Sequence, residues 1–139
     1  MSWDNYINTL VGQSKDASGR THVDRGAIVG LDGAPWTTRG HADALKASPE
    51  ELAVIARVMK SKDFTPFQSS GVVVEGVKYQ FLRVEDDKVV LAKRKDQGMI
   101  TMQSTKTAVV IAHCPEGGQQ GVMNKAVGVI ADYLESMGM

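Results

Sequence analysis

The stretch VVVEGVKYQFLRVEDDKVVLAKRKDQGMITMQSTKTAVVIAH, residues 72–113, decides the fold. It contains runs rich in β-branched and aromatic residues, which are typical of strands. These runs cover residues 72–74, 78–84, 88–94, 98–104 and 107–113. Separators such as Glu75-Gly76 leave room only for short turns, so consecutive strands are predicted to pair antiparallel as a meander.

A helix is predicted immediately upstream of these strands. Ser48 is a suitable N-cap, Pro49 fits the first helical position and Glu51 completes a capping box. Apolar residues follow at helical spacing, so the helix should run from Pro49 to about Lys60. Pro66, in the FTPF that comes next, excludes a second long helix.

Closer to the N-terminus, the run AIVGLDGAPW predicts a hairpin. Residues 13–25 are polar and read as a loop, after which an apolar run turns at Asp32-Gly33. On this interpretation Trp36 begins the returning strand.

Both ends of the chain have helical patterns. The first predicted helix follows Ser2 as N-cap, stops near Gly12 and has an apolar face formed by Trp3, Tyr6, Ile7 and Leu10. The last extends from Gln119 to Met137, with apolar residues recurring at Val122, Met123, Ala126, Val127, Ile130, Leu134 and Met137. Helices therefore stand at both ends of a central antiparallel sheet.

Composition limits the class of protein. A chain of 139 residues is long enough for one domain, residues 1–139, with its own core. Sixteen basic and sixteen acidic residues cancel, so nucleic acid or membrane binding would require a local patch. The single cysteine, Cys114, fits a reducing compartment, and no apolar run approaches a membrane span. A cytoplasmic location is expected.

No catalytic set stands out. His22, His41 and His113 lack metal-ligand spacing, so structural roles are expected and no metal or cofactor is predicted. The run GGQQG lacks the lysine and hydroxyl residue of a phosphate-binding loop. Asp86 and Asp87 read as a solvated turn. A binding module is favoured over an enzyme, although a small enzyme or ligand sensor on a similar sheet remains an alternative.

Five segments together resemble the profilin family. They are S-W-x-x-Y at the start, A-I-V-G-x-D-G-x-x-W, G-V-K-Y before a basic strand, T-K-T-A-V-V, and A-D-Y-L-x-x-x-G near the end. The resemblance implies an α+β fold with the N- and C-terminal helices on one face of the sheet and shorter helices on the other. It also implies a cytoplasmic, cytoskeleton-associated protein that binds monomeric actin, proline-rich proteins and phosphoinositides.

The same resemblance assigns a groove for proline-rich ligands to Trp3, Tyr6, Trp36 and Tyr133. Flat rings can stack on the pyrrolidine faces of a polyproline II helix, and indole N–H and phenol O–H groups can donate to its carbonyls. From spacing alone, ordinary core packing of the two tryptophans is an equal alternative. Vertebrate profilins have a histidine where Tyr133 stands and a tyrosine in place of Met139.

The actin-facing surface implied by the resemblance contains Lys78, Arg83, Arg94, Gln119, Asn124 and Lys125. Without the family, these would read as solvated strand and helix faces. Gln119 replaces a histidine of vertebrate members, and Gly128 and Val129 replace a tyrosine and a glutamate. An adaptor that binds proline motifs without binding actin is therefore the alternative function.

A phosphoinositide site is expected at the basic cluster Lys88, Lys93, Arg94 and Lys95. Asp86, Asp87 and Asp96 flank it, so a solvated charged hairpin is the alternative. Because Arg94 belongs to both predicted surfaces, lipid headgroups and actin should compete.

Overall fold

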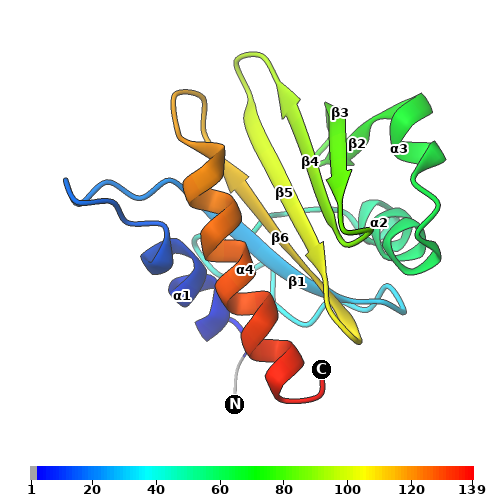
Figure 1. The fold of residues 1–139 in the computed structure, drawn as a ribbon, viewed down its shortest axis with the longest axis horizontal. Helices are drawn as coiled ribbons and strands as arrows, with labels where there is room; N and C mark the ends of the chain where they lie inside the picture. The colour runs from blue at the N-terminus through cyan, green and yellow to red at the C-terminus, as the bar shows by residue number, and fades with distance from the viewer. Residues whose placement is uncertain (1–2) are drawn as a thin grey trace.

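A six-stranded antiparallel sheet, with strands in the order β1-β6-β5-β4-β3-β2, forms the centre of the computed structural model, which describes residues 3–139 (Figure 1). Each strand from β2 to β6 pairs with the next one along the chain, so the predicted meander is confirmed. The first strand pairs with the last. The strands are β1 Arg25–Gly30, β2 Val72–Val74, β3 Val77–Glu85, β4 Val89–Arg94, β5 Gly98–Ser104 and β6 Ala108–Cys114.

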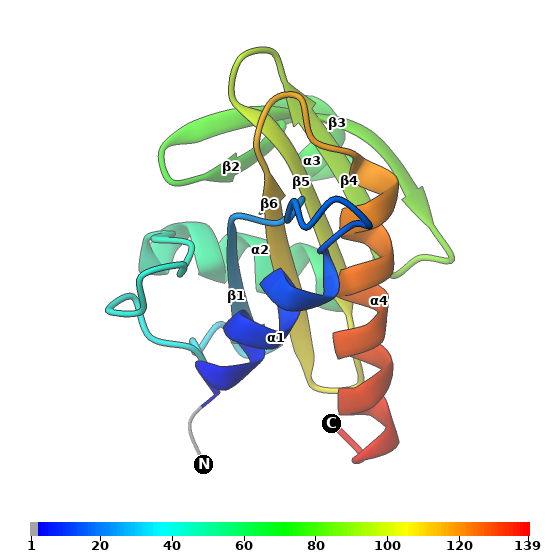
Figure 2. The ribbon, with the colours of Figure 1, turned by 90° about the vertical axis from the view of Figure 1, so that its left-hand side faces the viewer.

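Within residues 3–139, four helices cover the two faces of this sheet. The terminal helices α1 and α4 lie side by side on one face, with α2 and α3 on the other (Figures 1 and 2). The arrangement is the α+β fold predicted from the sequence. The helices are α1 Asn5–Gln13, α2 Pro49–Ser61, α3 Thr65–Ser70 and α4 Gln120–Ser136. Among the described residues, none of these helices is long and apolar enough to cross a membrane.

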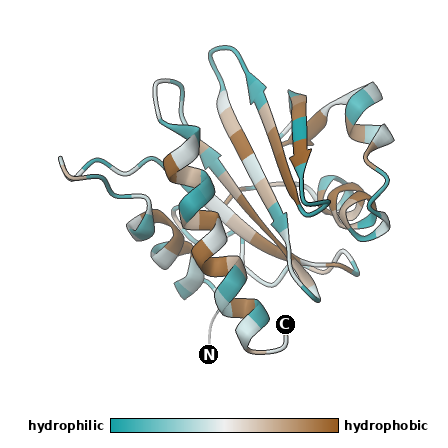
Figure 3. Cartoon of the chain, in the orientation of Figure 1, coloured by the Kyte–Doolittle hydropathy of each residue, from teal (hydrophilic) through white to brown (hydrophobic). Residues whose placement is uncertain are grey.

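The sheet separates two hydrophobic clusters. Side chains of α2, α3 and one sheet face form the first, around Ile55, Phe67 and Val90. Side chains of α1, α4 and the opposite face form the second, around Leu10, Val110 and Leu134. Along α4, hydrophobic and polar residues alternate, as expected for a helix with one buried side (Figure 3).

The capping box of α2 forms as predicted. The Ser48 hydroxyl accepts a bond from the Glu51 N–H at 3.1 Å, and the Glu51 carboxylate accepts one from the Ser48 N–H at 2.9 Å. The same carboxylate also accepts bonds from the N–H groups of Glu75 and Gly76, at 2.9 and 2.8 Å. These two residues form the tight β2–β3 turn, both with positive φ, at 55° and 76°. Glu51 therefore fastens the start of α2 to a turn of the sheet.

The predicted hairpin at Asp32-Gly33 is wrong in its second half. The chain does turn after Gly30, but Trp36 does not begin a strand: within the described residues, the returning segment forms a single antiparallel bridge, between Val29 and Pro35. The Thr37 hydroxyl accepts a bond from the Ile28 N–H at 3.1 Å, and residues 34–45 continue as a loop along β1. A side-chain hydroxyl here replaces the backbone group that a returning strand would supply.

This loop occupies the outer edge of β1. Gly26 N–H donates to the Asp43 carbonyl at 3.0 Å, and the Gly26 carbonyl accepts from Leu45 N–H at 2.9 Å. The Ile28 carbonyl accepts from Trp36 N–H at 2.9 Å, and Gly30 N–H donates to the carbonyl of residue 34 at 2.8 Å. The outward-facing backbone groups of β1 are thus already bonded.

The predicted helix boundaries need smaller corrections. Helix α1 ends at Gln13 instead of stopping at Gly12, because the Ser14 N–H still bonds the Val11 carbonyl and closes one more turn. The predicted N-cap, Ser2, lies outside the described residues. The sequence pattern did not locate helix α3, although the resemblance implies shorter helices on this face: Pro66 excludes a long helix but suits the first turn of this short one.

Candidate functional site

Four aromatic rings form a continuous row where α1, α4 and the loop after β1 meet. Trp3 lies between Trp36 and Tyr6, with ring centroids 4.7 Å and 5.3 Å apart. Tyr6 in turn lies 6.1 Å from Tyr133 of α4. The structure therefore brings together all four residues of the predicted groove, from three separate segments of the chain.

The row is partly exposed and partly embedded in the core. Tyr133 is 50% exposed and Tyr6 only 9%, and Trp3 and Trp36 are half-buried against the cluster of α1 and α4. Burial, together with the neighbouring Tyr133, raises the pKa of the Tyr6 phenol above its ordinary value. The Tyr6 phenol therefore remains a protonated donor at neutral pH. The two tryptophans thus pack on the core while one side of the row faces solvent.

Two hydrogen-bonded contacts hold the Trp36 loop against α1. Thr38 donates to the Asp4 carboxylate through its N–H, at 2.7 Å, and through its hydroxyl, at 2.5 Å. These bonds lower the pKa of Asp4. His41 Nε2 donates to Asn8 Oδ1 at 2.8 Å, and its Nδ1 accepts from the Asp43 N–H at 2.9 Å. The contact between the Trp3 and Trp36 rings is therefore fixed by hydrogen bonds outside the row itself.

Met139 closes the end of the chain against the same region. Its side chain packs on the cluster of α1 and α4, and its N–H donates to the Leu134 carbonyl at 2.9 Å. Its carbonyl oxygen accepts bonds from the Thr107 N–H at 2.6 Å and from the hydroxyls of Thr105 and Thr107 at 2.8 and 2.7 Å. Met139 supplies an apolar surface beside the aromatic row without a phenol group.

The residues predicted to face actin divide into two groups. Arg83 of β3 pairs with Leu91 of β4, and Leu91 pairs with Thr101 of β5. The Thr101 hydroxyl donates to Asn124 Oδ1 at 2.5 Å, which joins this row to α4. Cross-strand partners project from the same face, so Arg83 lies on the α4 face. Gln119, at the start of α4, and Lys125, within it, are exposed on this side of the sheet.

Lys78 and Arg94 do not join that surface. Arg94 follows Lys93 in β4, and side chains of consecutive strand residues point to opposite faces. The Arg94 guanidinium donates to the Lys78 carbonyl at 3.0 Å. The Lys78 side chain lines a hollow beside α3 with Phe67 and Ser69. The predicted set of six is therefore not one patch.

The predicted phosphoinositide cluster is also dispersed. Lys88 precedes β4 and Lys95 follows it, which separates the two backbones by about 20 Å at 3.3 Å per residue. Lys93 and Arg94 point to opposite faces of the strand. One headgroup cannot contact all four side chains, because proximity in sequence along a strand is not proximity in space.

The start of α4 is held by a buried histidine that sequence reasoning left without a partner. His22 Nδ1 accepts a bond from the Gln119 N–H at 3.0 Å, and His22 Nε2 donates to the Asp16 carboxylate at 2.8 Å. His22 is 2% exposed. Hydrogen bonds from Ser18 and His22 lower the pKa of Asp16 well below its usual range. Because His22 and Gln119 are separated by 97 positions in the sequence, no local pattern could reveal the contact.

A second buried histidine ties β6 to the start of β1. His113 contacts the Asp24 carboxylate through Nδ1, at 2.6 Å, and the Gln97 carbonyl through Nε2, at 2.7 Å. Burial by itself would raise the pKa of Asp24, but the hydrogen bond and charge of His113 and the charge of Arg25 outweigh it, so the pKa is lowered. Neither buried histidine lines the aromatic row.

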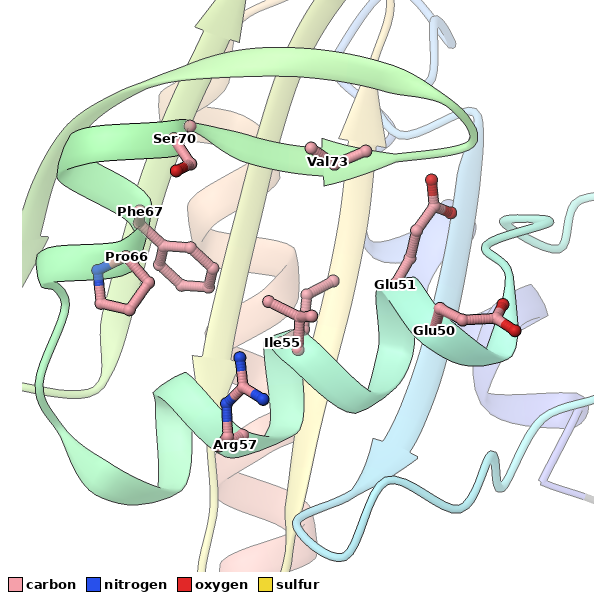
Figure 4. Close-up of a pocket in the computed structure, with 10 residues that line it drawn as sticks. Glu50, Glu51, Ile55, Arg57, Pro66, Phe67, Ser70 and Val73 are labelled. Carbon is pink, nitrogen blue, oxygen red and sulfur yellow. The ribbon is translucent and has the colours of Figure 1, made fainter.

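An apolar pocket of about 340 Å³ lies on the opposite face, between α2, α3 and β2 (Figure 4). Its walls include Ile55, Phe67 and Val73, with Glu51 and Arg57 at the rim. Both Glu51 oxygens are engaged by backbone N–H groups, so Glu51 acts as a structural acceptor here. No group of three or more His, Cys, Asp or Glu residues able to hold a metal occurs within residues 3–139.

Comparison with known proteins gives a consistent result. The family model described as Profilin matches residues 1–139. The chain belongs to the profilin family. A curated profilin of Heliocidaris crassispina is 65% identical over 140 residues, covering all of both chains. The crystal structure of Acanthamoeba castellanii profilin II is 30% identical and superimposes with a TM-score of 0.79, over 99% of this chain and 100% of that one.

Two more distant profilin structures contain bound partners. Mouse profilin IIa, in complex with a double repeat from the FH1 domain of mDia1, is 20% identical with a TM-score of 0.71 over the whole of both chains. LokiProfilin2, in complex with rabbit actin, is 19% identical with a TM-score of 0.69, over 96% of this chain and 97% of that one. At these identities the likeness to this profilin concerns the fold alone.

Proposed function

We propose that this profilin binds proline-rich segments along the row Trp36, Trp3, Tyr6 and Tyr133. The contiguity of these four rings is the observation that carries the proposal. A polyproline II helix advances about 3.1 Å per residue and presents flat pyrrolidine faces, so a row of rings offers repeated stacking positions. The mouse family member in complex with FH1 repeats supports this choice of ligand.

The row is suited to an extended ligand because it is organised before binding. The bonds from Thr38 to Asp4 and from His41 to Asn8 position the Trp36 loop on α1. A rigid site loses little conformational entropy when it is filled, and polyproline II segments are themselves preformed. Weak stacking contacts can then add up to measurable affinity.

The intrinsic fluorescence of the protein tests this proposal directly. Trp3 and Trp36 are the only two tryptophans in the chain, so a bound proline decamer should change the emission of both. Trp3→Ala should abolish saturable binding while leaving the far-ultraviolet circular dichroism nearly unchanged. Leu82→Ala, which removes an exposed apolar side chain from β3, is the matched control. Undiminished binding by folded Trp3→Ala would contradict the groove assignment.

We further propose that the chain binds actin monomers through the α4 face. The proposed surface contains Arg83, Gln119, Asn124 and Lys125. Its two basic side chains would meet an acidic partner, where complementary charge speeds association and fixes the register. The complex of LokiProfilin2 with rabbit actin supports the partner. The protein would regulate actin assembly in the cytoplasm, at the cytoskeleton, by binding alone and without covalent chemistry.

The assembly of monomeric actin, followed by fluorescence, tests this second activity. The protein should suppress spontaneous nucleation in proportion to its concentration. Lys125→Glu should weaken the effect, whereas Arg57→Glu, the same charge change on the opposite face of the sheet, should not. An unchanged time course from protein that still binds proline decamers would favour the adaptor function instead.

Phosphoinositide binding is proposed at Lys93 and Lys95, without Lys88. Vesicles containing phosphatidylinositol bisphosphate should retain the wild-type protein more than a Lys93→Glu, Lys95→Glu variant. Equal retention of the two proteins would contradict a site at this position.

A further inference from the structure

A basic hollow adjoins the Trp36 end of the aromatic row. It has a volume of about 360 Å³ and lies where the end of β1, the β5–β6 turn and the last turn of α2 come together. Trp36 lines both this hollow and the row. Its lining residues are Gly30, Leu31, Asp32, Trp36, Lys60, Lys106 and Thr107.

Two lysines give the hollow its charge. Lys60 comes from α2 and Lys106 from the β5–β6 turn, and both are exposed. Neither ammonium group has a hydrogen bond or ion pair with another residue in the described part of the chain. The one acid in the lining, Asp32, accepts a bond from the Ala34 N–H at 3.0 Å. The hollow therefore carries an excess of positive charge with no internal partner for its lysines.

The indole N–H of Trp36 adds a third donor on this side. A Cβ atom built on Gly30, which lines the hollow, would lie 2.9 Å from Trp36 Nε1 and 2.6 Å from Asp32 Oδ1. The nitrogen edge of the ring thus lies against the end of β1, while the ring packs on Trp3 with centroids 4.7 Å apart. A glycine at position 30 leaves space for this arrangement.

We propose that the preferred ligands of this profilin carry acidic residues directly beyond the proline run, at the end that lies over Trp36. The proposal rests on the proline-binding function proposed above. Prolines would stack on the row, and a glutamate or aspartate that follows would accept bonds from Lys60, Lys106 and the Trp36 N–H. Charge-assisted bonds of this kind favour carboxylates over neutral or basic side chains. The lysines would therefore fix both the choice of ligand and its direction along the row.

Five synthetic peptides test the inference by tryptophan fluorescence at low ionic strength. Each contains a run of ten prolines. One is flanked by two serines. Two carry a pair of glutamates, at the N-terminal end in one and at the C-terminal end in the other, and two carry a pair of lysines in the same way. Exposed ion pairs are individually weak, so we expect the better glutamate peptide to bind about tenfold more tightly than its lysine counterpart. Raising the salt to about 0.5 M should shrink this difference, because exposed charges are screened.

Charge reversal in the protein supplies the second comparison. Lys60→Glu with Lys106→Glu should reverse the preference in favour of lysine flanks and leave the serine-flanked peptide bound as in the wild type. Lys15→Glu, two residues beyond the C-terminal end of α1, is the control and should preserve the glutamate preference. The inference is overturned if wild-type protein binds all five peptides equally, or if the preference persists in the double variant. Failure to bind even the serine-flanked peptide would refute the proline-binding function as well.

Discussion

Removing the Glu51 carboxylate should destabilise the protein by about 3 kcal/mol. Its two oxygens accept three backbone bonds, from Ser48, Glu75 and Gly76, at 2.8 to 2.9 Å. Bonds to a charged acceptor contribute about 1.5 to 3 kcal/mol each when well buried. Water can reach these partly exposed groups, so about 1 kcal/mol for each bond is the better value. Glu51→Ala loses all three bonds.

The amide variant separates the geometry of the contact from its charge. Glu51→Gln retains one carbonyl oxygen, which can still accept from two of the N–H groups, but its NH₂ group faces the third donor. We expect a loss of about 1 to 1.5 kcal/mol for this change. Glu50→Gln, one residue earlier and without a hydrogen bond in the described structure, should cost less than about 0.5 kcal/mol.

Urea unfolding followed by circular dichroism measures all three variants. Native-state hydrogen exchange adds an independent measure, because the amides of Glu75 and Gly76 should exchange faster in Glu51→Ala. A loss below about 1 kcal/mol for Glu51→Ala would refute the reasoning. So would equal losses for the two glutamine variants.

Three further predictions concern backbone space, thiol reactivity and acid stability. Gly98→Ala should lower the free energy of unfolding in urea by about 3 kcal/mol. Its φ is +104°, and a Cβ there would lie 2.1 Å from the Cys114 carbonyl oxygen. Gly76→Ala, which has open space around it, should cost about 1 kcal/mol. Burial, followed by the charge of Asp24, raises the pKa of Cys114 to about 11, so alkylation by iodoacetamide at pH 8 should be about a hundredfold slower in the folded protein than in urea. The pKa of Asp24 is lower in the folded protein than its unfolded value of about 3.9, so the ionised carboxylate stabilises the fold at higher pH. This stabilisation is lost as the pH falls through the folded pKa. Acid titration of Asp24→Asn should therefore show a shallower loss of stability below about pH 4.

Local chemistry made most of the fold predictable. The capping box at Ser48 and Glu51 lies within four residues, and the strands of the meander are separated by turns of two or three residues. In both cases the residues that determine the structure are neighbours in sequence. The row of aromatic rings was predicted from family resemblance, because spacing alone could not distinguish it from core packing.

What escaped prediction depends on distant partners. Trp36 does not begin a strand: its N–H bonds the Ile28 carbonyl, but the Ile28 N–H donates to the Thr37 hydroxyl and not to a backbone carbonyl. The contact of His22 with Gln119 spans 97 residues. The four basic residues around β4 do not gather in one place for a different reason. An extended strand separates Lys88 from Lys95, and side chains of consecutive strand residues point to opposite faces.

The loop of residues 34–45 also governs how copies of the protein can meet. An unpaired edge strand is a template on which a second chain can extend a sheet, and such pairing leads to aggregates. Here the loop already bonds the outward groups of Gly26, Ile28 and Gly30, and β2 at the other edge is only three residues long. The segment that carries Trp36 to the aromatic row thus also shields β1 from other copies, so the protein can be kept at high concentration without sheets joining through that strand. Loosening the loop would damage recognition and solubility together.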